Sequence, residues 1–479
     1  MLLTATFSGY FLLVLLISWF AYRRTNTMSD FILGGRSLGR WTTALSAGAS
    51  DMSGWLLLGL PGYAYVAGFE AVWIALGLLI GSYLNWLLVA PRLREQSEAL
   101  NNALTLPEYF ENRFNDSRHF LRLFSALFIL LFFLFYTSSG LVAGGKLFQS
   151  VFDLPYHWAV IAGALAILSY TAFGGFLAVC WTDLFQGLLM SLALIAVAVL
   201  SVCDLGGIQE TVSAIHGKNP GLVSMFRTLD NNPISFLTMV SLLGWGLGYF
   251  GQPHIIIRFM AIEKLSLLRD ARRIAVTWTA VSMCSALIIG MIGIVYLEAP
   301  LIGSASETVF MELTKLIFHP LIAGICMAAI LAAIMSTADS QLLVASSAFT
   351  EDFYKIILSR NPTDKELVYV GRSAVIVIAM IATLLALNPD RKVLDLVSYA
   401  WAGFGATFGP VMLFSLFSKN MSETSAIAGI LTGGITVIIW KQLQGGIFDL
   451  YELVPGFILS CLVIHLSGMA RKTKINKTG

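Results

Sequence analysis

Long apolar stretches recur along almost the whole chain, and this repetition constrains the fold more than any other feature. A helix needs about 20 apolar residues to cross a bilayer. Stretches of that kind lie near residues 3–22, 41–67, 70–90, 120–148, 157–178, 180–203, 234–259, 274–297, 312–345, 368–387, 393–418, 424–440 and 451–470. Because the backbone inside a bilayer has to satisfy its own hydrogen bonds, each stretch is expected to be helical. The sequence therefore predicts an all-α polytopic membrane protein with about 13 transmembrane helices.

The composition excludes an ordinary soluble protein. Hydrophobic residues make up 57% of the 479 positions and charged residues 12%, whereas a soluble domain has about a quarter of its residues charged. The segments between the apolar stretches are shorter than the ~50 residues that a soluble domain needs. We therefore expect a single membrane domain that fills residues 1–479.

Lysine and arginine are distributed unevenly between the two sets of loops. The loops after odd-numbered spans and the C-terminal tail contain 23 of the 30 basic residues, among them Arg23, Arg24, Arg36 and Arg258, and the opposite loops contain the other 7. Basic loops remain on the cytoplasmic side of a membrane. The pattern predicts a multi-pass membrane protein with its N-terminus outside and its C-terminus in the cytoplasm.

Two spans contain many residues that weaken a helix. The second span includes Gly48, Ser53, Gly54 and Pro61, and the seventh contains the segment GWGLGYFGQPH. In a membrane such segments are tolerated where the backbone lines a cavity enclosed by protein. The two spans are five apart, as expected for two inverted five-helix repeats that each open on a broken helix. We expect the repeats at 41–203 and 234–418, with peripheral spans and the cytoplasmic tail at 424–479.

Asp51 is the strongest single indication of function. It lies near the middle of an apolar span, where an ionised carboxylate costs about 2.5–3.5 kcal/mol on insertion scales. Such a residue should face the interior of the bundle and have an ion, a proton or hydroxyl groups as a partner. An unwound turn here would also free backbone carbonyls for a cation and amides for a substrate carboxylate.

Other polar residues in the spans could complete such a site. Ser336, Thr337, Asp339 and Ser340 follow one another in the otherwise apolar segment AILAAIMSTADSQLL, and could supply oxygen ligands. Asp183 lies near the cytoplasmic start of the sixth span, where an ion-path role and simple solvation or capping are equally consistent with its position. The spans also contain the aromatic residues Tyr136, Trp245 and Tyr249. Their side chains either pack against neighbouring helices or shape a substrate pocket.

Several of these segments together resemble the sodium/solute symporter family, and within it the bacterial sodium/proline symporters. The resemblance rests on FILGGRSLG, ALSAGASDMSGW, NNALTLPEYF, YTAFGGFLA, CWTD, GWGLGYFGQPH, ILAAIMST and VSYAWAGFGATFGP. It implies the five-plus-five inverted-repeat (LeuT-like) fold and sodium-coupled uptake of L-proline.

The resemblance also implies roles for particular residues. Sodium ligands would be Ala49, Met52, Ala333, Ser336 and Thr337. Residues of sodium coupling or the ion path would be Asp51, Asp183, Asp339, Ser340 and Arg36. Substrate-binding residues would be Ser53, Gly54, Tyr136, Trp245, Tyr249 and Pro253. Whether Asp339 and Ser340 form a second sodium site with Asp183 stays open.

The residues predict a secondary active transporter, and the resemblance implies that it lies in the bacterial inner membrane, uses sodium as its coupling ion and has no cofactor. No nucleotide-binding, metalloprotease or nucleophile-elbow motif stands in a suitable context, so we expect neither an enzyme nor a nucleic-acid-binding protein. The closest alternative is a symporter of another small amino acid or carboxylate. A membrane sensor or a channel-like protein is the alternative from a different class.

Overall fold

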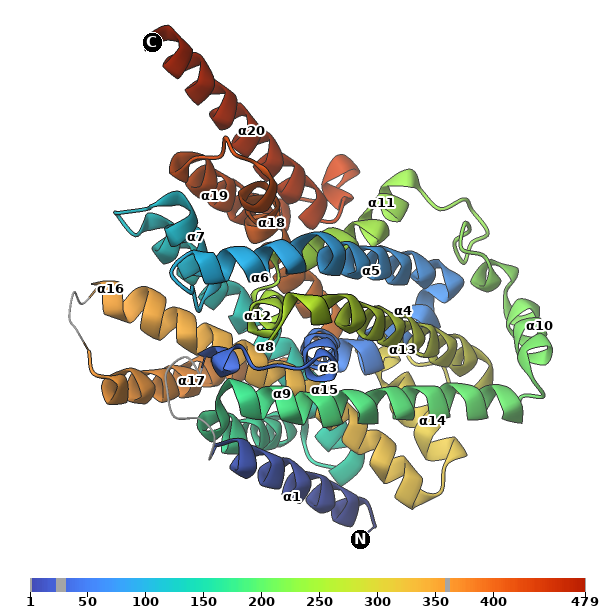
Figure 1. Ribbon diagram of the computed structural model, residues 1–479. Coiled ribbons are helices and arrows are strands. Elements are labelled where there is room, and N and C mark those ends of the chain that lie inside the picture. The colour runs from blue at the N-terminus through green and yellow to red at the C-terminus, as the bar shows by residue number, and fades with distance from the viewer. Residues whose placement is uncertain (1, 23–31, 358–361, 479) are drawn as a thin grey trace.

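The computed structural model describes residues 2–22, 32–357 and 362–478, and these are almost entirely helical (Figure 1). Arg23 and Arg24, which contribute to the orientation argument, lie outside the described residues. Within the described part of the chain, eight helical runs are long and apolar enough to cross a membrane. The predicted all-α, polytopic membrane fold is therefore confirmed, and the total of thirteen spans stays a prediction.

The first five-helix unit opens on a broken helix, as predicted. Its elements are α3 (Arg40–Asp51), η2 (Trp55–Gly59), α4 (Leu60–Ala67), η3 (Gly68–Ala71), α5 (Val72–Leu84), η4 (Asn85–Val89), α6 (Ala90–Ala99), α8 (Phe120–Phe152) and α9 (Tyr156–Asp204). α9 contains both the fifth and the sixth predicted span. They meet at Gly175, whose positive φ of 65° interrupts the helical geometry, and glycine adopts this conformation without steric cost.

The second unit repeats this order and also opens on a broken helix. Its elements are α11 (Phe236–Gly244), η6 (Trp245–Gly251), α12 (Pro253–Ala261), α13 (Leu268–Tyr296), α15 (Pro320–Ser347), η9 (Ala348–Tyr354), α16 (Lys355–Ile357), α17 (Asp364–Ala386) and α18 (Val393–Phe417). Short helices on the connections are α7 (Leu106–Phe114), α10 (Ile208–Lys218) and α14 (Val309–Ile317).

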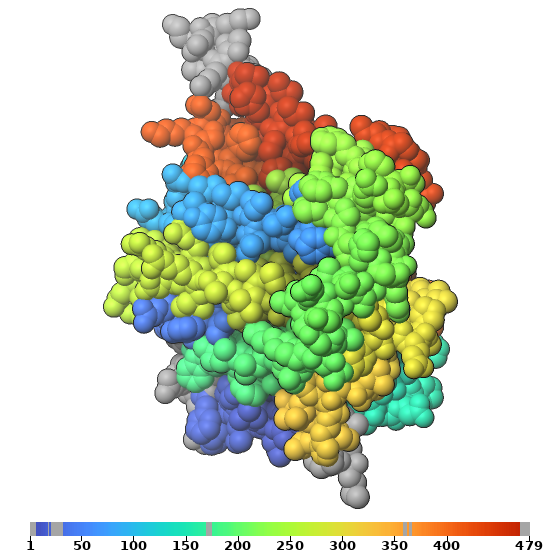
Figure 2. All heavy atoms as spheres, turned by 90° about the vertical axis from the view of Figure 1, so that its right-hand side faces the viewer, coloured from blue at the N-terminus to red at the C-terminus, as the bar shows by residue number. Residues whose placement is uncertain are grey.

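Three helices flank the two units. They are α1 (Leu2–Tyr22), α19 (Glu423–Trp440) and α20 (Leu453–Thr478). α1 packs against α9 and α15, and α20 packs against α18 and α19. In both views α1 and α20 lie at opposite ends of the bundle (Figure 1 and Figure 2), so the broken helices stay in the interior.

One predicted span, 312–345, has different limits in the structure. It covers the end of α14 and most of α15, which are separate helices. His319 precedes the new helix and accepts from the Leu321 amide at 3.4 Å, and Pro320 begins α15. Proline is favoured at the first position of a helix because its missing amide hydrogen is not needed there. The membrane-length helix therefore begins later and continues beyond residue 345 to Ser347.

Two close contacts hold the units together. A Cβ on Gly81 of α5 would lie 2.1 Å from the Gly246 carbonyl oxygen of η6, so only glycine allows this approach. Near the start of α18, the Glu307 carboxylate pairs with Lys146 Nζ at 2.6 Å and accepts from the Val393 amide at 2.9 Å. This carboxylate joins α8, the segment before α14 and α18.

Candidate functional site

The first half of the first broken helix, α3, ends at Asp51, and the second half begins three residues later. Ser53 and Gly54, which have low helix propensity, occupy the interruption. Met52 leaves the helical region with φ −84° and ψ 67°. The Leu56 amide, which in a continuous helix would donate to the Met52 carbonyl, donates to the Ser53 carbonyl at 3.0 Å. The break therefore frees the Met52 carbonyl for another partner.

Four oxygen atoms from α3 and α15 meet beside this break. The Ser336 hydroxyl lies 2.9 Å from the Ala49 carbonyl oxygen and 3.1 Å from the Ala333 carbonyl oxygen. The Thr337 hydroxyl lies 3.2 Å from the Ala49 carbonyl oxygen. All four residues are buried. Neutral carbonyl and hydroxyl oxygens at an unwound helix are the ligands with which transporters coordinate sodium.

The structure therefore brings together four of the five predicted sodium ligands. The fifth, Met52, is fully buried at the break, three residues after Ala49. We refer to Ala49, Ala333, Ser336 and Thr337 as the neutral oxygen cluster.

Asp51 connects the two broken helices. Its Oδ2 atom accepts a hydrogen bond of 2.5 Å from the Tyr249 hydroxyl of η6. Its backbone carbonyl accepts from the Tyr136 hydroxyl at 3.3 Å and from the Trp55 indole at 3.1 Å. The Oδ1 atom is buried and, among the described residues, has no hydrogen-bond partner. Because buried carboxylate oxygens require a donor or a cation, this oxygen is available to a ligand.

α18 fixes the second break from one side. Gln252 is extended (φ −81°, ψ 106°), and Pro253 begins α12 immediately after it. The Gln252 side-chain amide donates to the Gly248 carbonyl at 3.0 Å and to the Trp401 carbonyl at 3.2 Å. The Trp401 indole donates in turn to the Trp245 carbonyl at 2.8 Å. The carbonyls released by the interruption thus find partners within the protein.

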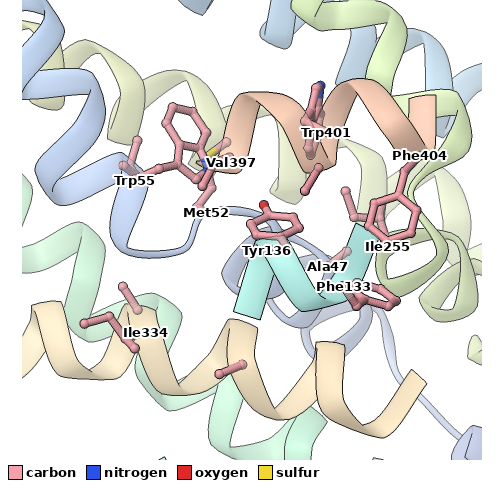
Figure 3. Packing of buried hydrophobic residues seen from close by; sticks show 14 of the residues in the cluster. Ala47, Met52, Trp55, Phe133, Tyr136, Ile255, Ile334, Val397, Trp401 and Phe404 are labelled. Carbon is pink, nitrogen blue, oxygen red and sulfur yellow. The ribbon is translucent and has the colours of Figure 1, made fainter. Parts of the chain in front are cut away.

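Aromatic rings surround both breaks. The ring centroids of Trp55 and Trp245 are 6.3 Å apart, and those of Tyr249 and Trp401 are 5.0 Å apart at an interplanar angle of 88°. Figure 3 shows the Tyr136 ring between the segment that carries Met52 and Trp55 and the helix that carries Trp401. An apolar wall with hydroxyl groups at its edge suits a small amphipathic solute.

The predicted substrate residues gather at these breaks. Tyr136, Trp245 and Tyr249 contribute the rings described above. Ser53 Oγ accepts from the Trp55 amide at 3.3 Å, and a Cβ on Gly54 would lie 2.8 Å from that of Ala143 on α8. Pro253 stands at the second break. Their role in binding stays a prediction.

A second cluster, the charged cluster, joins α3, α9, α12 and α15. Asp183 is fully buried, and its Oδ2 atom accepts from Ser46 at 2.7 Å, from Ser50 at 3.0 Å and from the Arg258 guanidinium at 3.3 Å. Arg258 also donates to Ser46 at 3.1 Å and to Ser340 at 2.5 Å. This is a buried ion pair whose hydrogen bonds are largely supplied by hydroxyl groups.

Ser340 links the charged cluster to the neutral one. Its hydroxyl lies 2.9 Å from the Ser50 hydroxyl, 3.0 Å from the Ser336 carbonyl oxygen and 3.4 Å from Asp339 Oδ1. Three of the five residues predicted for sodium coupling or the ion path, Asp183, Asp339 and Ser340, therefore lie close together. The structure does not test whether an ion passes there.

Arg36 lies away from both clusters. Its guanidinium donates to the Met260 carbonyl at 2.6 Å, to Asn102 at 2.7 Å and to the Ala103 carbonyl at 3.0 Å. Burial, with a smaller contribution from Arg94, lowers the pKa of Arg36 to about 10. Arg36 ties the end of α12 to the connection between α6 and α7.

Sequence reasoning missed Arg258 and treated it as a loop residue, which is wrong. α12 continues to Ala261, so the guanidinium stays inside the bundle and is fully buried. One signal was present in the segment PHIIIRFM, where His254 and Arg258 are four residues apart and share one helix face. Both are completely buried.

Two interior helices that break at facing positions, with carbonyl and hydroxyl oxygens beside one break, define a secondary transporter with a five-plus-five inverted-repeat core. The solved structure of a sodium-coupled sialic acid symporter, substrate-bound and outward-open, matches with a TM-score of 0.81 at 20% identity over 98% of each chain. The transporter MhsT in complex with L-phenylalanine matches with a TM-score of 0.55 at 17% identity, over 90% of this chain and 98% of that one.

Residues 31–433 match the model of the sodium:solute symporter family, and the chain belongs to this family. The sodium/proline symporter of Salmonella typhimurium is 50% identical over 472 residues, which cover 98% of this chain and 93% of the relative. The Escherichia coli protein of the same name is 49% identical over 480 residues, covering 98% and 94%. The high-affinity proline transporter of Bacillus subtilis is 49% identical over 453 residues and 94% of each chain. The relatives are transporters and not enzymes.

Proposed function

We propose that the chain couples the entry of sodium to the uptake of L-proline by alternating access. The relatives named as proline transporters, which match over nearly the full chain, support this substrate. The observation that carries the coupling is the neutral oxygen cluster beside the first break. It joins the two structural units, so a cation bound there favours one arrangement of α3 against α15.

Sodium binds to the carbonyls of Ala49, Met52 and Ala333 and to the hydroxyls of Ser336 and Thr337. The free Met52 carbonyl supports its place in this shell. Both hydroxyls currently use their protons on carbonyl oxygens, and sodium binding requires them to turn so that their lone pairs face the ion.

Proline binds between the two breaks. Gly54 places a backbone amide at the start of a helical segment, which favours the substrate carboxylate. The Ser53 amide donates to the Asp51 carbonyl at 3.0 Å, so Ser53 offers its hydroxyl group. Tyr136, Trp245 and Tyr249, with Pro253, surround the apolar ring. Asp51 holds Tyr249 and the first break together, and its free Oδ1 atom faces the positive charge of the sodium ion or of the substrate.

Ion binding on the outside orders the first break, which completes the proline site. The occupied protein then opens inward, and the ions leave past Asp183, Asp339, Ser340 and the Arg36 contact. The membrane potential contributes ~2.3 kcal/mol per charge per 100 mV to this cycle. The repeats at 41–203 and 234–418 move against each other in the bacterial inner membrane, with the N-terminus outside and the C-terminus cytoplasmic.

Uptake of labelled L-proline into proteoliposomes under an imposed sodium gradient tests the proposal. We expect accumulation with sodium outside and none with potassium in its place. Accumulation of a different amino acid or carboxylate would replace proline and keep the sodium coupling. Equal flux with and without sodium would favour a channel-like protein and overturn the proposal.

A further inference from the structure

A small hollow lies between α7, α8, α12 and the end of α15, away from both oxygen clusters. Its volume is about 20 Å³, enough for about one water molecule. Its walls include the apolar side chains of Ile129, Pro253, Ile257 and Met260, and the polar side chains of Thr105 and Asp352. Since Pro253 begins α12, the hollow starts at the second break.

The polar end of this hollow contains a carboxylate that is only half satisfied. Asp352 is fully buried, and its Oδ1 atom accepts from Arg122 Nε at 2.6 Å and from the Thr105 hydroxyl at 3.1 Å. Its Oδ2 atom is buried without a hydrogen-bond partner in the described part of the chain. A buried carboxylate oxygen without a donor is costly, so a donor or a cation is the missing partner.

The positive charge beside Asp352 is shared with other carboxylates. Arg122 is shared, because it also pairs with Glu111 at 3.2 Å. Glu111 in turn lies 3.0 Å from His119 Nδ1, and Glu108 acts on the same guanidinium as a further carboxylate. Arg122 is thus divided between Asp352 and Glu111. The unpaired Oδ2 atom of Asp352 can therefore receive a further donor, and a positively charged donor forms the stronger hydrogen bond.

Asp352 is far from the site proposed for sodium. Thr337 and Asp352 are 15 residues apart on one continuous helical run of α15 and η9, which corresponds to ~20 Å along the axis. Asp352 lies beyond the C-terminal end of α15, on the side of the membrane that the distribution of basic residues predicts to be cytoplasmic. The hollow thus lies where a solute that leaves the breaks on the inner side would pass.

We propose that Asp352 forms a second, inner binding position for the substrate, where its free carboxylate oxygen receives the secondary ammonium group of proline. The apolar walls contact the pyrrolidine ring. The hollow is smaller than proline, so the position forms when α12 and α15 separate in the inward-facing conformation. This inference rests on the proposed function, and it adds a position that begins at Pro253 of the second break and extends inward to Asp352.

The test uses the full chain in oriented proteoliposomes and measures proline transport from each side. Asp352→Asn keeps the size of the side chain and removes its charge. We expect the KM for proline presented at the inner face to rise about tenfold, because the loss of a hydrogen bond between charged groups weakens binding by roughly that factor. The outer KM and the sodium half-saturation should stay within twofold. Glu351→Gln is the matched control, because Glu351 is the adjacent acid and pairs with Lys355 at 3.2 Å; it should leave the inner KM unchanged.

A chemical probe gives an answer even where the variant does not insert into the membrane. N-acetylproline lacks the ammonium group, so it should compete with proline at the inner face of the wild type at least tenfold more weakly than at the outer face. Equal competition at both faces would overturn the inference, as would an unchanged inner KM in Asp352→Asn. A shift of the sodium half-saturation alone would assign Asp352 to the ion instead. Absence of sodium-driven uptake by the wild type would refute the proposed function itself.

Discussion

The neutral and the charged oxygen cluster are neighbours on α3 and α15, yet they are completed in different ways. The neutral cluster contains carbonyl oxygens and two hydroxyl groups. The two hydroxyl protons are fewer than the oxygen lone pairs in the cluster, so some lone pairs have no hydrogen-bond donor within it. The charged cluster has a guanidinium at its centre, because Arg258 reaches Asp183, Ser46 and Ser340. The protein thus supplies its own cation to the charged cluster, where Asp183 Oδ2 is paired and Oδ1 has no hydrogen-bond partner among the described residues. Under the proposed function, the comparison favours the neutral cluster as the place where the transported sodium binds.

The largest change in sodium half-saturation is expected when both hydroxyls of the neutral cluster are removed. In the double variant Ser336→Ala/Thr337→Val, the sodium half-saturation for uptake should rise at least ~100-fold, because each contact with a charged ligand contributes about 1.5–3 kcal/mol. Thr314→Val is the control, since the Thr314 hydroxyl donates to the Phe310 carbonyl within α14 at 2.6 Å. An unchanged half-saturation would exclude the neutral cluster as the sodium site.

Removing the guanidinium should destabilise the charged cluster and expose its affinity for cations. Arg258→Met leaves Asp183 buried without its counter-charge, which costs about 3–5 kcal/mol. We expect a lower midpoint of thermal unfolding in detergent, a larger stabilisation by sodium than in the wild type, and recovery in Arg258→Met/Asp183→Asn. If sodium stabilised the variant and the wild type equally, the view that Arg258 stands in for an ion would be wrong.

A smaller effect is expected from the bond between the two breaks. Tyr249→Phe removes the hydroxyl that donates to Asp51, and a hydrogen bond to a charged acceptor contributes about 1.5–3 kcal/mol. The KM for proline should rise about tenfold or more, whereas Asp51→Ala should abolish concentrative uptake in a protein that still inserts. Normal uptake by Asp51→Ala would remove this residue from the mechanism.

The smallest effect separates the two clusters at their shared residue. Ser340→Ala removes a hydroxyl that contacts both, but Arg258 keeps its contacts with Asp183 and Ser46. Ser340 reaches the neutral cluster through one hydrogen bond, to the Ser336 carbonyl at 3.0 Å. We therefore expect a two- to fivefold change in sodium half-saturation, or about 0.5–1 kcal/mol, the ordinary contribution of one neutral hydrogen bond. A change as large as that of the neutral-cluster variant would mean that the two clusters act as one ion site.

The sequence predicted the fold well, because its main signals are local. Apolar length and the helix-weakening residues around Met52 and Gly248 were enough to locate the membrane helices and both breaks. The join between α14 and α15 was missed because His319 and Pro320 interrupt the helix without interrupting the apolar pattern.

The site was less predictable because its contacts join helices that are distant in the chain. Asp51 was recognised from its chemistry, since a carboxylate in an apolar span needs a partner. Ala49 and Ala333 contribute only backbone oxygens, so their side chains give no signal, and family resemblance supplied them. Arg258 was misplaced because an arginine near the end of a span has the same pattern whether it reaches solvent or turns inward to Asp183, 75 residues away in the chain.

The bond from the Trp55 indole to the Asp51 carbonyl gives the molecule a built-in optical and magnetic reporter. Any rewinding of the first break moves a carbonyl dipole relative to an aromatic ring, and indole emission and ring fluorine shifts both respond to such a dipole. The chain has 11 tryptophans, so fluorotryptophan labelling with Trp55→Phe as the assignment variant would isolate this one signal. The state of the first broken helix could then be followed in a membrane without attaching a probe to the site.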